Sequence, residues 1–392
     1  MRKKLIIIVF LLSCLKVVFS SQKIDFWNDQ RKGTNYFNIN PTENWFKAAH
    51  SLGIDWVRIA YEKWKGKQRD FLLGDASNYQ GIVKEDIKKL IQVLDWAHKY
   101  HIKVVITPLG LPGNRWIQKN GGRRDLRLWN NRKYWEQSAD FWQDLVIHIN
   151  NHPAVYAYNI INEPIPEMKT GIPEHGKASR YHSWYKKYKG TTHDLIAFYE
   201  LVIKSIRKKD IETPIMLDAG WYAQPNAFVY WPKIKDDAIL YSFHMYEPYN
   251  FTNRKNFHNK HNIRYPGKVT FADKEIDWNK HQIEIYFSPF LEWAKKNGIA
   301  NNRIVNSEFG CYRRNDGCQE YLTDVIAVLN SHHIHWAFYS FREDDWDGYD
   351  YEVGTGGLGA AYWQAKDAGK NPEVPRKENQ LFSVIKREFQ KR

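Results

Sequence analysis

Short apolar runs alternate with amphipathic helical segments along this chain, and this alternation constrains its fold more than any other feature. Eight runs have the length and composition of strands; they cover residues 33–37, 56–60, 104–107, 156–161, 214–217, 239–243, 303–305 and 336–341. Between them, apolar residues recur at intervals of three and four, as in Ile87, Leu90, Ile91, Leu94 and Ala97. Eight strands that alternate with helices predict an α/β fold whose parallel sheet closes into a (β/α)8 TIM barrel.

The start of the chain and the lack of linkers predict one exported domain. Residues 1–20 combine a basic start, a short apolar stretch and small residues near Ser20, which is typical of a secretory signal peptide. Lipid anchoring through Cys14 is a weaker alternative, because Leu12 fits a lipoprotein signal poorly. No later apolar stretch is long enough to span a bilayer. We expect a secreted monomer, extracellular or periplasmic, whose single catalytic domain covers residues 21–392. Long polar loops should follow the sixth and eighth strands, over residues 249–277 and 342–379.

Two glutamates each lie at the downstream end of an apolar run. Glu163 follows the fourth run, in Asn162-Glu163-Pro164, and Glu308 follows the seventh, in Ser307-Glu308-Phe309-Gly310. Folding explains these positions poorly, because a structural glutamate normally lies on a solvated helix face. In a parallel barrel the downstream ends of all strands meet at one face, where active sites lie. Two carboxyl groups there provide what the cleavage of a glycosidic bond requires: one acid for the leaving oxygen and one carboxylate that attacks or activates water.

Further polar residues are expected at the same face. Arg58 interrupts the apolar second strand, and a buried arginine needs an anionic partner, for which Glu308 is a candidate. His244 and Tyr246 are two residues apart at the end of the sixth strand, so they share a face, and a tyrosine hydroxyl there can keep a carboxylate ionised. Asn162, at the end of the fourth strand, can donate to a sugar hydroxyl. A purely structural ion pair of Arg58, and core packing of His244 or Tyr246, remain open as alternatives.

Together these segments resemble a known enzyme family, the retaining family 5 glycoside hydrolases, which include cellulases and mannanases. The resemblance rests on Val57-Arg58-Ile59, Asn162-Glu163-Pro164, His244-Met245-Tyr246 and Ser307-Glu308-Phe309-Gly310, in this order and spacing. It extends over the whole mature chain and includes Gly33-Thr34-Asn35 on the first strand, which implies a supporting role for Asn35. One such motif is a weak signal, since Asn-Glu-Pro arises easily by chance, but four on the expected strands are specific.

The resemblance implies a role for each of these residues. Glu163 would be the general acid/base, and Glu308 the nucleophile that forms a glycosyl-enzyme intermediate. Arg58 and Tyr246 would hold Glu308 ionised, while His244 would lie near Glu163 and tune it. The two carboxyl groups would then lie about 5–5.5 Å apart, the spacing of retaining enzymes. The expected reaction needs no cofactor and no metal. Its substrate would be a β-linked polysaccharide or glycoconjugate, with a cellulose-like β-glucan and endoglucanase-like action as the first choice.

Two positions depart from the family's pattern. The third strand of the family usually ends in a histidine, within a motif like Asp-Leu-His-x-x-Pro-Gly, and this chain has Leu109 there. The eighth strand usually presents a tryptophan beneath the sugar at the cleavage point, and the matching residue here is Tyr339. By strand parity Trp336 lies on the opposite face, although we include both aromatic residues among the expected substrate-supporting positions. The changes alter the floor of the subsite beside the scissile bond, so specificity for ordinary cellulose does not follow from the resemblance.

Cysteine usage and charge narrow the remaining possibilities. Cys311 and Cys318 close a short polar loop after Glu308, and in an exported protein such a pair predicts a disulfide, with two unrelated thiols as the alternative. The formal charge is +14, but the basic residues are scattered, which indicates a solvated surface and no nucleic-acid site. The 15 histidines are scattered too, so we expect no metal centre.

Aromatic residues are abundant, with 17 Trp and 24 Tyr in 392 residues, and aromatic faces bind the flat faces of sugar rings. Those in polar, loop-like contexts are Trp116, Trp129, Trp221, Trp231, Trp346 and Trp363. The sequence leaves two other activities open: a carbohydrate-binding barrel with weakened catalysis, and a transglycosylase. Linkage and endo- or exo-action also stay open, as does glycosylation of Asn250, whose sequon would be used only in a eukaryotic source.

Overall fold

Eight parallel strands close into a barrel, as the sequence predicts. The computed structural model describes residues 22–259, 261–370 and 372–391, so the expected signal peptide lies outside the described residues. The barrel strands are β1 (Lys32–Tyr36), β2 (Trp56–Ile59), β3 (Lys103–Ile106), β4 (Val155–Asn159), β5 (Ile215–Asp218), β6 (Ile239–Met245), β9 (Ile304–Phe309) and β10 (His335–Phe338). They pair in the order β1-β2-β3-β4-β5-β6-β9-β10, and β10 returns to β1. The (β/α)8 TIM barrel is therefore confirmed.

Strand β9 is longer than expected. We predicted that it ends at Val305, and the structure extends it to Phe309. The two residues after Val305 are fully buried and hydrogen-bonded to β6: Asn306 Nδ2 donates to the Phe243 carbonyl at 3.1 Å, and the hydroxyl of Ser307 pairs with that of Ser242. Because the Asn306 amide N–H and the Ser307 hydroxyl find partners on β6, the strand continues through Glu308 to Phe309.

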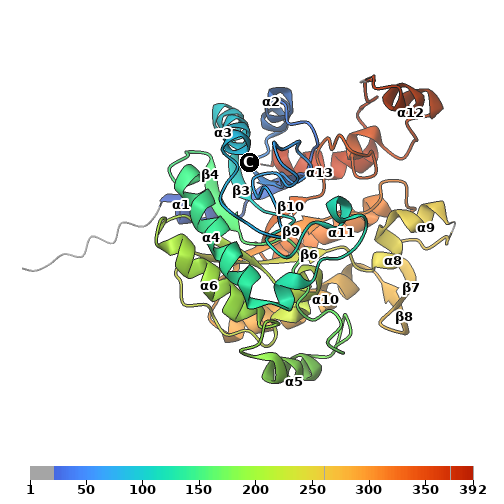
Figure 1. Cartoon of the computed structure of the whole chain (residues 1–392). Coiled ribbons are helices and arrows are strands. Elements are labelled where there is room, and N and C mark those ends of the chain that lie inside the picture. The colour runs from blue at the N-terminus through green and yellow to red at the C-terminus, as the bar shows by residue number, and fades with distance from the viewer. Residues whose placement is uncertain (1–21, 260, 371, 392) are drawn as a thin grey trace, which may run out of the picture.

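Helices surround the barrel (Figure 1). They are α1 (Gln22–Asp25), α2 (Glu43–Leu52), α3 (Lys84–Lys99), α4 (Arg132–Ile149), α5 (Ala178–Tyr188), α6 (Leu195–Arg207), α7 (Gly220–Ala223), α8 (Tyr249–Thr252), α9 (Arg254–His258), α10 (Lys280–Lys296), α11 (Cys318–Ser331), α12 (Ala360–Asp367) and α13 (Gln380–Gln390). The predicted apolar faces point inward; Leu90, Leu94 and Ala97 of α3 are fully buried. Only α7 and a short 3-10 turn lie between β5 and β6, in place of a long helix.

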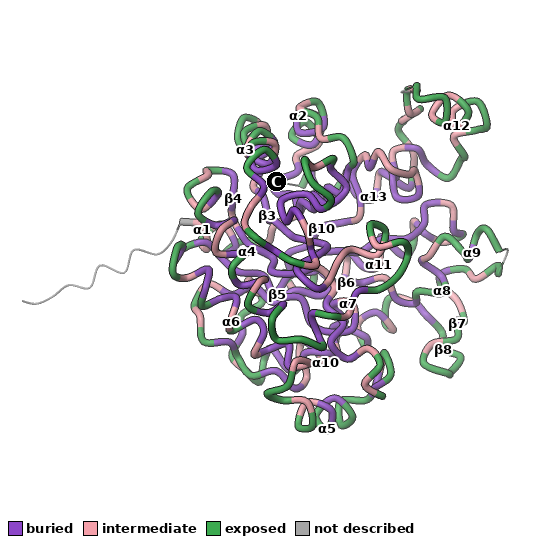
Figure 2. Tube along the Cα trace, viewed as in Figure 1, coloured by how far each residue is buried: buried purple, intermediate pink, exposed green. Residues whose placement is uncertain are grey.

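The core has two layers, visible as the buried centre of Figure 2. One lies between the strands and the helices, and the other fills the barrel itself. Trp27, just before β1, is fully buried and packs edge-on against Trp56 and His335, which stand at the amino ends of their strands. This plug closes the amino end of the barrel, so the opposite end is available for a cleft.

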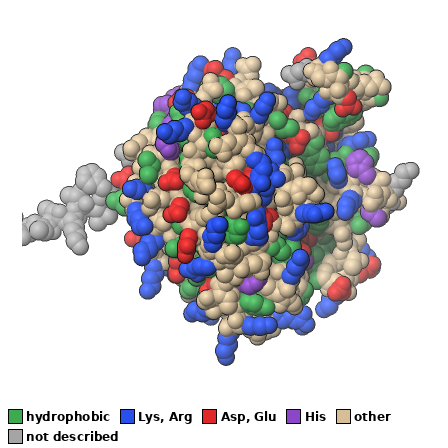
Figure 3. Space-filling model, in the orientation of Figure 1, with side chains coloured by type: hydrophobic (Ala, Val, Ile, Leu, Met, Phe, Trp, Pro, Cys, Tyr) green, Lys and Arg blue, Asp and Glu red, His purple; other side chains and the backbone are tan. Residues whose placement is uncertain are grey.

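The two long segments after β6 and β10 are present where the sequence predicts them. The first contains α8, α9 and an antiparallel hairpin of β7 (Gly267–Phe271) and β8 (Lys274–Trp278), which we had expected to be irregular. The second carries α12, which stands away from the barrel (Figure 1). Lysine and arginine are spread over the visible face with acidic residues between them (Figure 3). Among the described residues, no helix has the length and apolar character that crossing a membrane requires.

Candidate active site

A cleft of about 1010 Å³ opens at the carboxyl ends of the strands. Glu163 and Glu308 both line it, and so do Asn162, His244 and Tyr246. Barrel closure brings these residues together, because β4 and β9, although distant in sequence, end at the same face of the barrel. The sequence therefore identified the face of the barrel on which the polar side chains converge.

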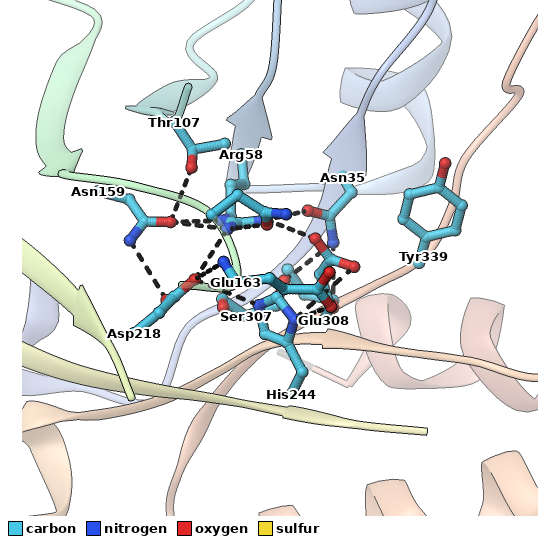
Figure 4. Close-up of polar contacts among 12 residues, drawn as sticks. Asn35, Arg58, Thr107, Asn159, Glu163, Asp218, His244, Ser307, Glu308 and Tyr339 are labelled. Carbon is cyan, nitrogen blue, oxygen red and sulfur yellow. Dashed lines mark hydrogen bonds and ion pairs between the residues drawn. The ribbon is translucent and has the colours of Figure 1, made fainter. Parts of the chain in front are cut away.

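Glu308 lies close to Arg58 (Figure 4), and both of its carboxylate oxygens accept hydrogen bonds. Arg58 Nη1 donates to Oε1 at 2.6 Å, and the Tyr246 hydroxyl donates to Oε2 at 2.8 Å. Glu308 is only 5% exposed, and Arg58 is fully buried. Burial beside Glu308 raises the pKa of Tyr246 well above its ordinary value, so its hydroxyl stays protonated and donates. Each oxygen of the Glu308 carboxyl group therefore accepts a hydrogen bond, and the two bonds fix its orientation.

Glu163 lies at the turn after β4 in a different environment. Its backbone has a φ of 48°, in the left-handed region that a non-glycine residue rarely adopts, and its N–H donates to Asp218 Oδ2 at 3.2 Å. Burial raises the pKa of its carboxyl; His244, 3.0 Å away, works against this rise, whereas the charges of Glu308 and Asp218 add to it. Glu163 therefore keeps its proton more readily than an ordinary glutamate.

His244 connects the carboxyl groups. Its Nδ1 lies 3.0 Å from Glu163 Oε1 and 3.9 Å from Glu308 Oε2, and its Nε2 lies 3.6 Å from Asp218 Oδ2. Burial works to lower the pKa of His244, but the surrounding carboxylates outweigh it, and the pKa is raised above its ordinary value. The imidazole therefore favours the cationic form.

Sequence analysis missed two members of the network. Asp218, at the end of β5, accepts from Arg58 Nη2 at 3.3 Å and from Asn159 Nδ2 at 3.2 Å, and it is fully buried. Asn159, on β4, accepts from Arg58 Nε at 2.9 Å and from the Thr107 hydroxyl at 2.8 Å. A signal was available for both, since each is a polar residue in or directly after an apolar strand, as Glu163 is.

The two expected asparagines lie next to Arg58. Asn162 lines the cleft, and its Oδ1 accepts from Arg58 Nη2 at 2.7 Å. Asn35 is fully buried; its Oδ1 accepts from Arg58 Nη1 at 3.3 Å and its Nδ2 donates to the Ser307 carbonyl at 2.9 Å. Asn35 thus lies behind Glu308, supporting the strand and the arginine.

The two departures from the family pattern both reach the cleft. Leu109 packs with Phe37, Trp116 and Tyr339 in a small apolar cluster, and each of these residues lines the cleft. Trp336, by contrast, does not reach it, which corrects our expectation. It is fully buried, packs against Phe309 and Phe389, and donates from Nε1 to Asn330 Oδ1 at 3.1 Å. Strand parity turns it outward, towards the surrounding helices.

The expected sugar-facing tryptophans divide into three groups. Trp116, Trp346 and the tyrosines Tyr222 and Tyr249 line the cleft. Trp129, Trp221 and Trp231 are buried in the main core, which corrects the expectation for them. Trp363 lies on α12, apart from the lining residues.

The predicted disulfide between Cys311 and Cys318 is present. It follows β9 directly, so it braces the wall that begins with Glu308. Tyr351 adds to this bracing, because its hydroxyl donates to the Tyr339 carbonyl at 3.0 Å and accepts from the Cys311 N–H at 3.1 Å.

Metal-ligating atoms come together at two places in the part of the chain that is described. One is the cluster of Glu163, His244 and Glu308, in which one ligand atom of each residue lies within 4.8 Å of the others. The second cluster also lines the cleft and consists of Glu174, His175 and Glu247. In the first cluster Arg58 already supplies a positive charge 2.6 Å from Glu308, which disfavours a cation there.

Comparisons with known proteins agree with this geometry. Endoglucanase C of Acetivibrio thermocellus is 21% identical over 339 residues, which are 80% of this chain and 88% of that protein. A β-xylosidase of Phanerodontia chrysosporium is 20% identical over 351 residues, or 86% of this chain, which spans 62% of that longer protein. A hyperthermophilic endo-β-1,4-glucanase solved in complex with substrate has the same fold, with a TM-score of 0.62, 19% identity, and coverage of 93% of this chain and 99% of that one. The sequence model of the cellulase family (glycosyl hydrolase family 5) matches residues 20–345, and this chain therefore belongs to that family of glycosyl hydrolases.

Proposed function

We propose that this protein is a secreted retaining β-glycosidase that cleaves O-glycosidic bonds of a β-linked glucan by double displacement. Glu163 is the general acid/base, and Glu308 is the nucleophile. The observation that carries the proposal is the spacing of these two groups, whose nearest oxygens lie within 4.8 Å of each other. Retaining enzymes hold their carboxyl groups about 5–5.5 Å apart, whereas inverting enzymes need roughly 6.5–9.5 Å to admit a water molecule.

The first step forms a covalent intermediate. Glu308 attacks the anomeric carbon while Glu163 gives its proton to the leaving oxygen, so one C–O bond forms as the other breaks. The raised pKa of Glu163 supports this step, because the acid must start protonated. Arg58 and Tyr246 support it as well, because each donates to one oxygen of the attacking carboxylate and together they fix its direction.

The second step releases the sugar. Glu163, now a carboxylate, takes a proton from water, and the water oxygen attacks the anomeric carbon and displaces Glu308. Two inversions give net retention of the β-configuration. His244 prepares Glu163 for this step, because its positive charge stabilises the carboxylate form that Glu163 must have before it can accept a proton.

A β-glucan is the substrate that we place first. The relatives with the widest coverage include endoglucanases, and the cleft is large and lined by aromatic rings, which suits successive sugar residues. Xylan comes second because a β-xylosidase is also a relative. The apolar cluster around Leu109 offers no side-chain hydrogen bond, so it favours a sugar whose edge facing Leu109 needs none.

We also propose that the protein is exported. Residues 1–20 carry the pattern of a signal peptide, and a buried disulfide near the active site suits an oxidising compartment. Expression of the full chain with N-terminal sequencing tests this: a secreted form beginning near residue 21 supports export, and a cytoplasmic form that keeps Met1 contradicts it.

A glycan panel tests the proposed activity. The purified protein and its Glu308→Gln variant are incubated with β-glucans, xylan, mannan and aryl β-glycosides, and the products are identified by mass spectrometry. Products absent from the variant support the glycosidase and name its sugar. NMR of the first product decides the stereochemistry, since a β-anomer supports retention and an α-anomer refutes it. Binding without products on every substrate would favour a carbohydrate-binding barrel.

A further inference from the structure

A buried carboxylate that the proposed mechanism does not use lies behind the wall of the cleft. Glu343 follows β10 and is only 4% exposed. Its Oε1 accepts from Lys63 Nζ at 2.6 Å and from the Tyr339 hydroxyl at 2.9 Å. Its Oε2 accepts from Trp346 Nε1 at 3.0 Å and from the Ser340 hydroxyl at 3.4 Å. One side chain therefore receives four donors.

Three of these donors belong to residues that line the cleft, whereas Glu343 lies behind them. Lys63 comes from the segment after β2, and Trp346 comes from the long segment after β10. Tyr339 follows β10 directly and stands beside Glu308 (Figure 4). Glu343 thus ties together parts of the cleft wall that are distant in sequence.

The hydroxyl of Tyr339 is turned away from the cleft, towards Glu343. The ring itself is held by aromatic neighbours: it packs edge-on against Phe37 at 5.4 Å and against Tyr349 at 5.3 Å. Because the hydroxyl and the ring are fixed separately, the orientation of the ring in the cleft is determined. Phenylalanine at this position would keep the ring contacts and lose the anchor.

The chemistry of the cluster requires a carboxylate at its centre. Burial raises the pKa of Glu343, but the charge of Lys63 and the hydrogen bonds of Lys63 and Tyr339 oppose the rise. Lys63 also lies 3.0 Å from Asp345 Oδ2. Two partners can only donate, and they contact different oxygens: the Lys63 ammonium lies at Oε1 and the Trp346 indole N–H lies at Oε2, so both oxygens must accept. A glutamine there has nearly the same shape, but its amide nitrogen would face a donor.

From these contacts, and resting on the function proposed above, we propose that Glu343 is a positioning residue for the sugar that binds beside Glu308. It acts through Tyr339 and Trp346, whose aromatic faces it orients. The position at which the family usually has a tryptophan is therefore occupied by a tyrosine with its own anchor. Lys63 stabilises this cluster, because its ammonium group is the counter-charge of the buried Glu343 carboxylate.

Steady-state kinetics of Glu343→Gln, Tyr339→Phe and the double variant test the proposal on the substrate that the panel identifies. We expect each single variant to raise KM about tenfold while kcat changes less than about threefold, because the sugar loses binding that the ground and transition states share. The double variant should be no worse than Glu343→Gln alone, because both changes break one linkage. Glu388→Gln is the matched control: Glu388 on α13 also accepts from a lysine and an asparagine, Lys32 at 3.0 Å and Asn330 at 2.9 Å, away from the cleft.

The outcomes separate this proposal from the proposed activity. An unchanged KM in Glu343→Gln, or losses that add in the double variant, would overturn the positioning role. The positioning role would also be overturned if Glu343→Gln and Glu388→Gln lowered thermal stability and changed KM equally, since Glu343 would then have only a structural role. If the wild type binds a glycan without cleaving it, the proposed activity fails, and calorimetry then decides: about tenfold weaker binding by Glu343→Gln supports the role, and equal binding overturns it. A wild type that neither cleaves nor binds overturns both.

Discussion

Tyr246→Phe removes one hydroxyl from the cleft and leaves the ring in place. That hydroxyl donates to Glu308 Oε2 at 2.8 Å, while the other carboxylate oxygen keeps its bond to Arg58 at 2.6 Å. The substitution therefore takes away one of the two donors that orient the proposed nucleophile. Because Glu308 is only 5% exposed, water has little room to replace the lost donor.

The size of the effect follows from the kind of bond. A hydrogen bond to a charged group contributes about 1.5–3 kcal/mol, and about 1.4 kcal/mol corresponds to a tenfold change in rate. We therefore expect kcat/KM to fall by about 10- to 150-fold. Most of the loss should be in kcat, because the hydroxyl contacts the carboxylate that attacks in the transition state.

Tyr79→Phe is the matched control. The Tyr79 hydroxyl also donates to a carboxylate, Asp144 Oδ2 at 2.6 Å, but this pair lies outside the cleft. The same chemical change there should leave kcat and KM unaltered. The reasoning is refuted if Tyr246→Phe keeps kcat/KM within about threefold of the wild type, or if Tyr79→Phe loses as much activity as Tyr246→Phe.

Three further predictions follow from the same structure. Glu163→Ala should lower kcat/KM by about 10²- to 10⁴-fold, and the loss should be smallest on aryl glycosides with good leaving groups, which need no acid. Added azide should give a β-glycosyl azide. Equal losses on all leaving groups would contradict the acid role. His244→Asn should move the basic limb of kcat/KM to higher pH, because His244 lowers the pKa of Glu163 and its loss lets that pKa rise; a limb that moves down contradicts the contact. Replacing Cys311 and Cys318 by serine together should lower the free energy of unfolding by about 2 kcal/mol in urea titrations, the chain-entropy value for so short a loop; unchanged stability would show that the bridge adds nothing.

Most of the fold could be predicted from local sequence patterns. Each barrel strand is a short apolar run that needs no distant information to be recognised, and so all eight were located. The same logic identified Glu163 and Glu308, since a carboxyl directly after a buried run has no folding reason to be there. It applies equally to Asp218, which closes the apolar run of β5, and the sequence contained that signal although we did not use it.

Contacts between segments that are distant in the chain could not be predicted from the sequence. Lys63 and Glu343 are 280 positions apart, and nothing in either neighbourhood indicates the other before the barrel closes. Burial of individual tryptophans is similarly a property of the packed molecule: Trp231 looks loop-like in sequence, yet it is 3% exposed. Trp336 is different, because strand parity already placed it opposite Tyr339, and its inclusion among the substrate-supporting residues went against that argument.

The distribution of charge distinguishes the two glutamates to which the proposed mechanism gives different tasks. Two groups that favour the cationic form, Arg58 and His244, face three carboxyl groups, those of Glu163, Asp218 and Glu308. Arg58 is committed to Asp218 and Glu308, and Tyr246 adds a donor to Glu308 alone. Glu163 is left with His244, which it shares with both other acids. Because the cations balance only two negative charges, the pKa of the third carboxyl group, that of Glu163, is raised, and this group has the fewest donors. The proposed acid, Glu163, and the proposed nucleophile, Glu308, therefore differ in the number of donors that the barrel directs at each, and this number is what the His244→Asn and Tyr246→Phe variants change.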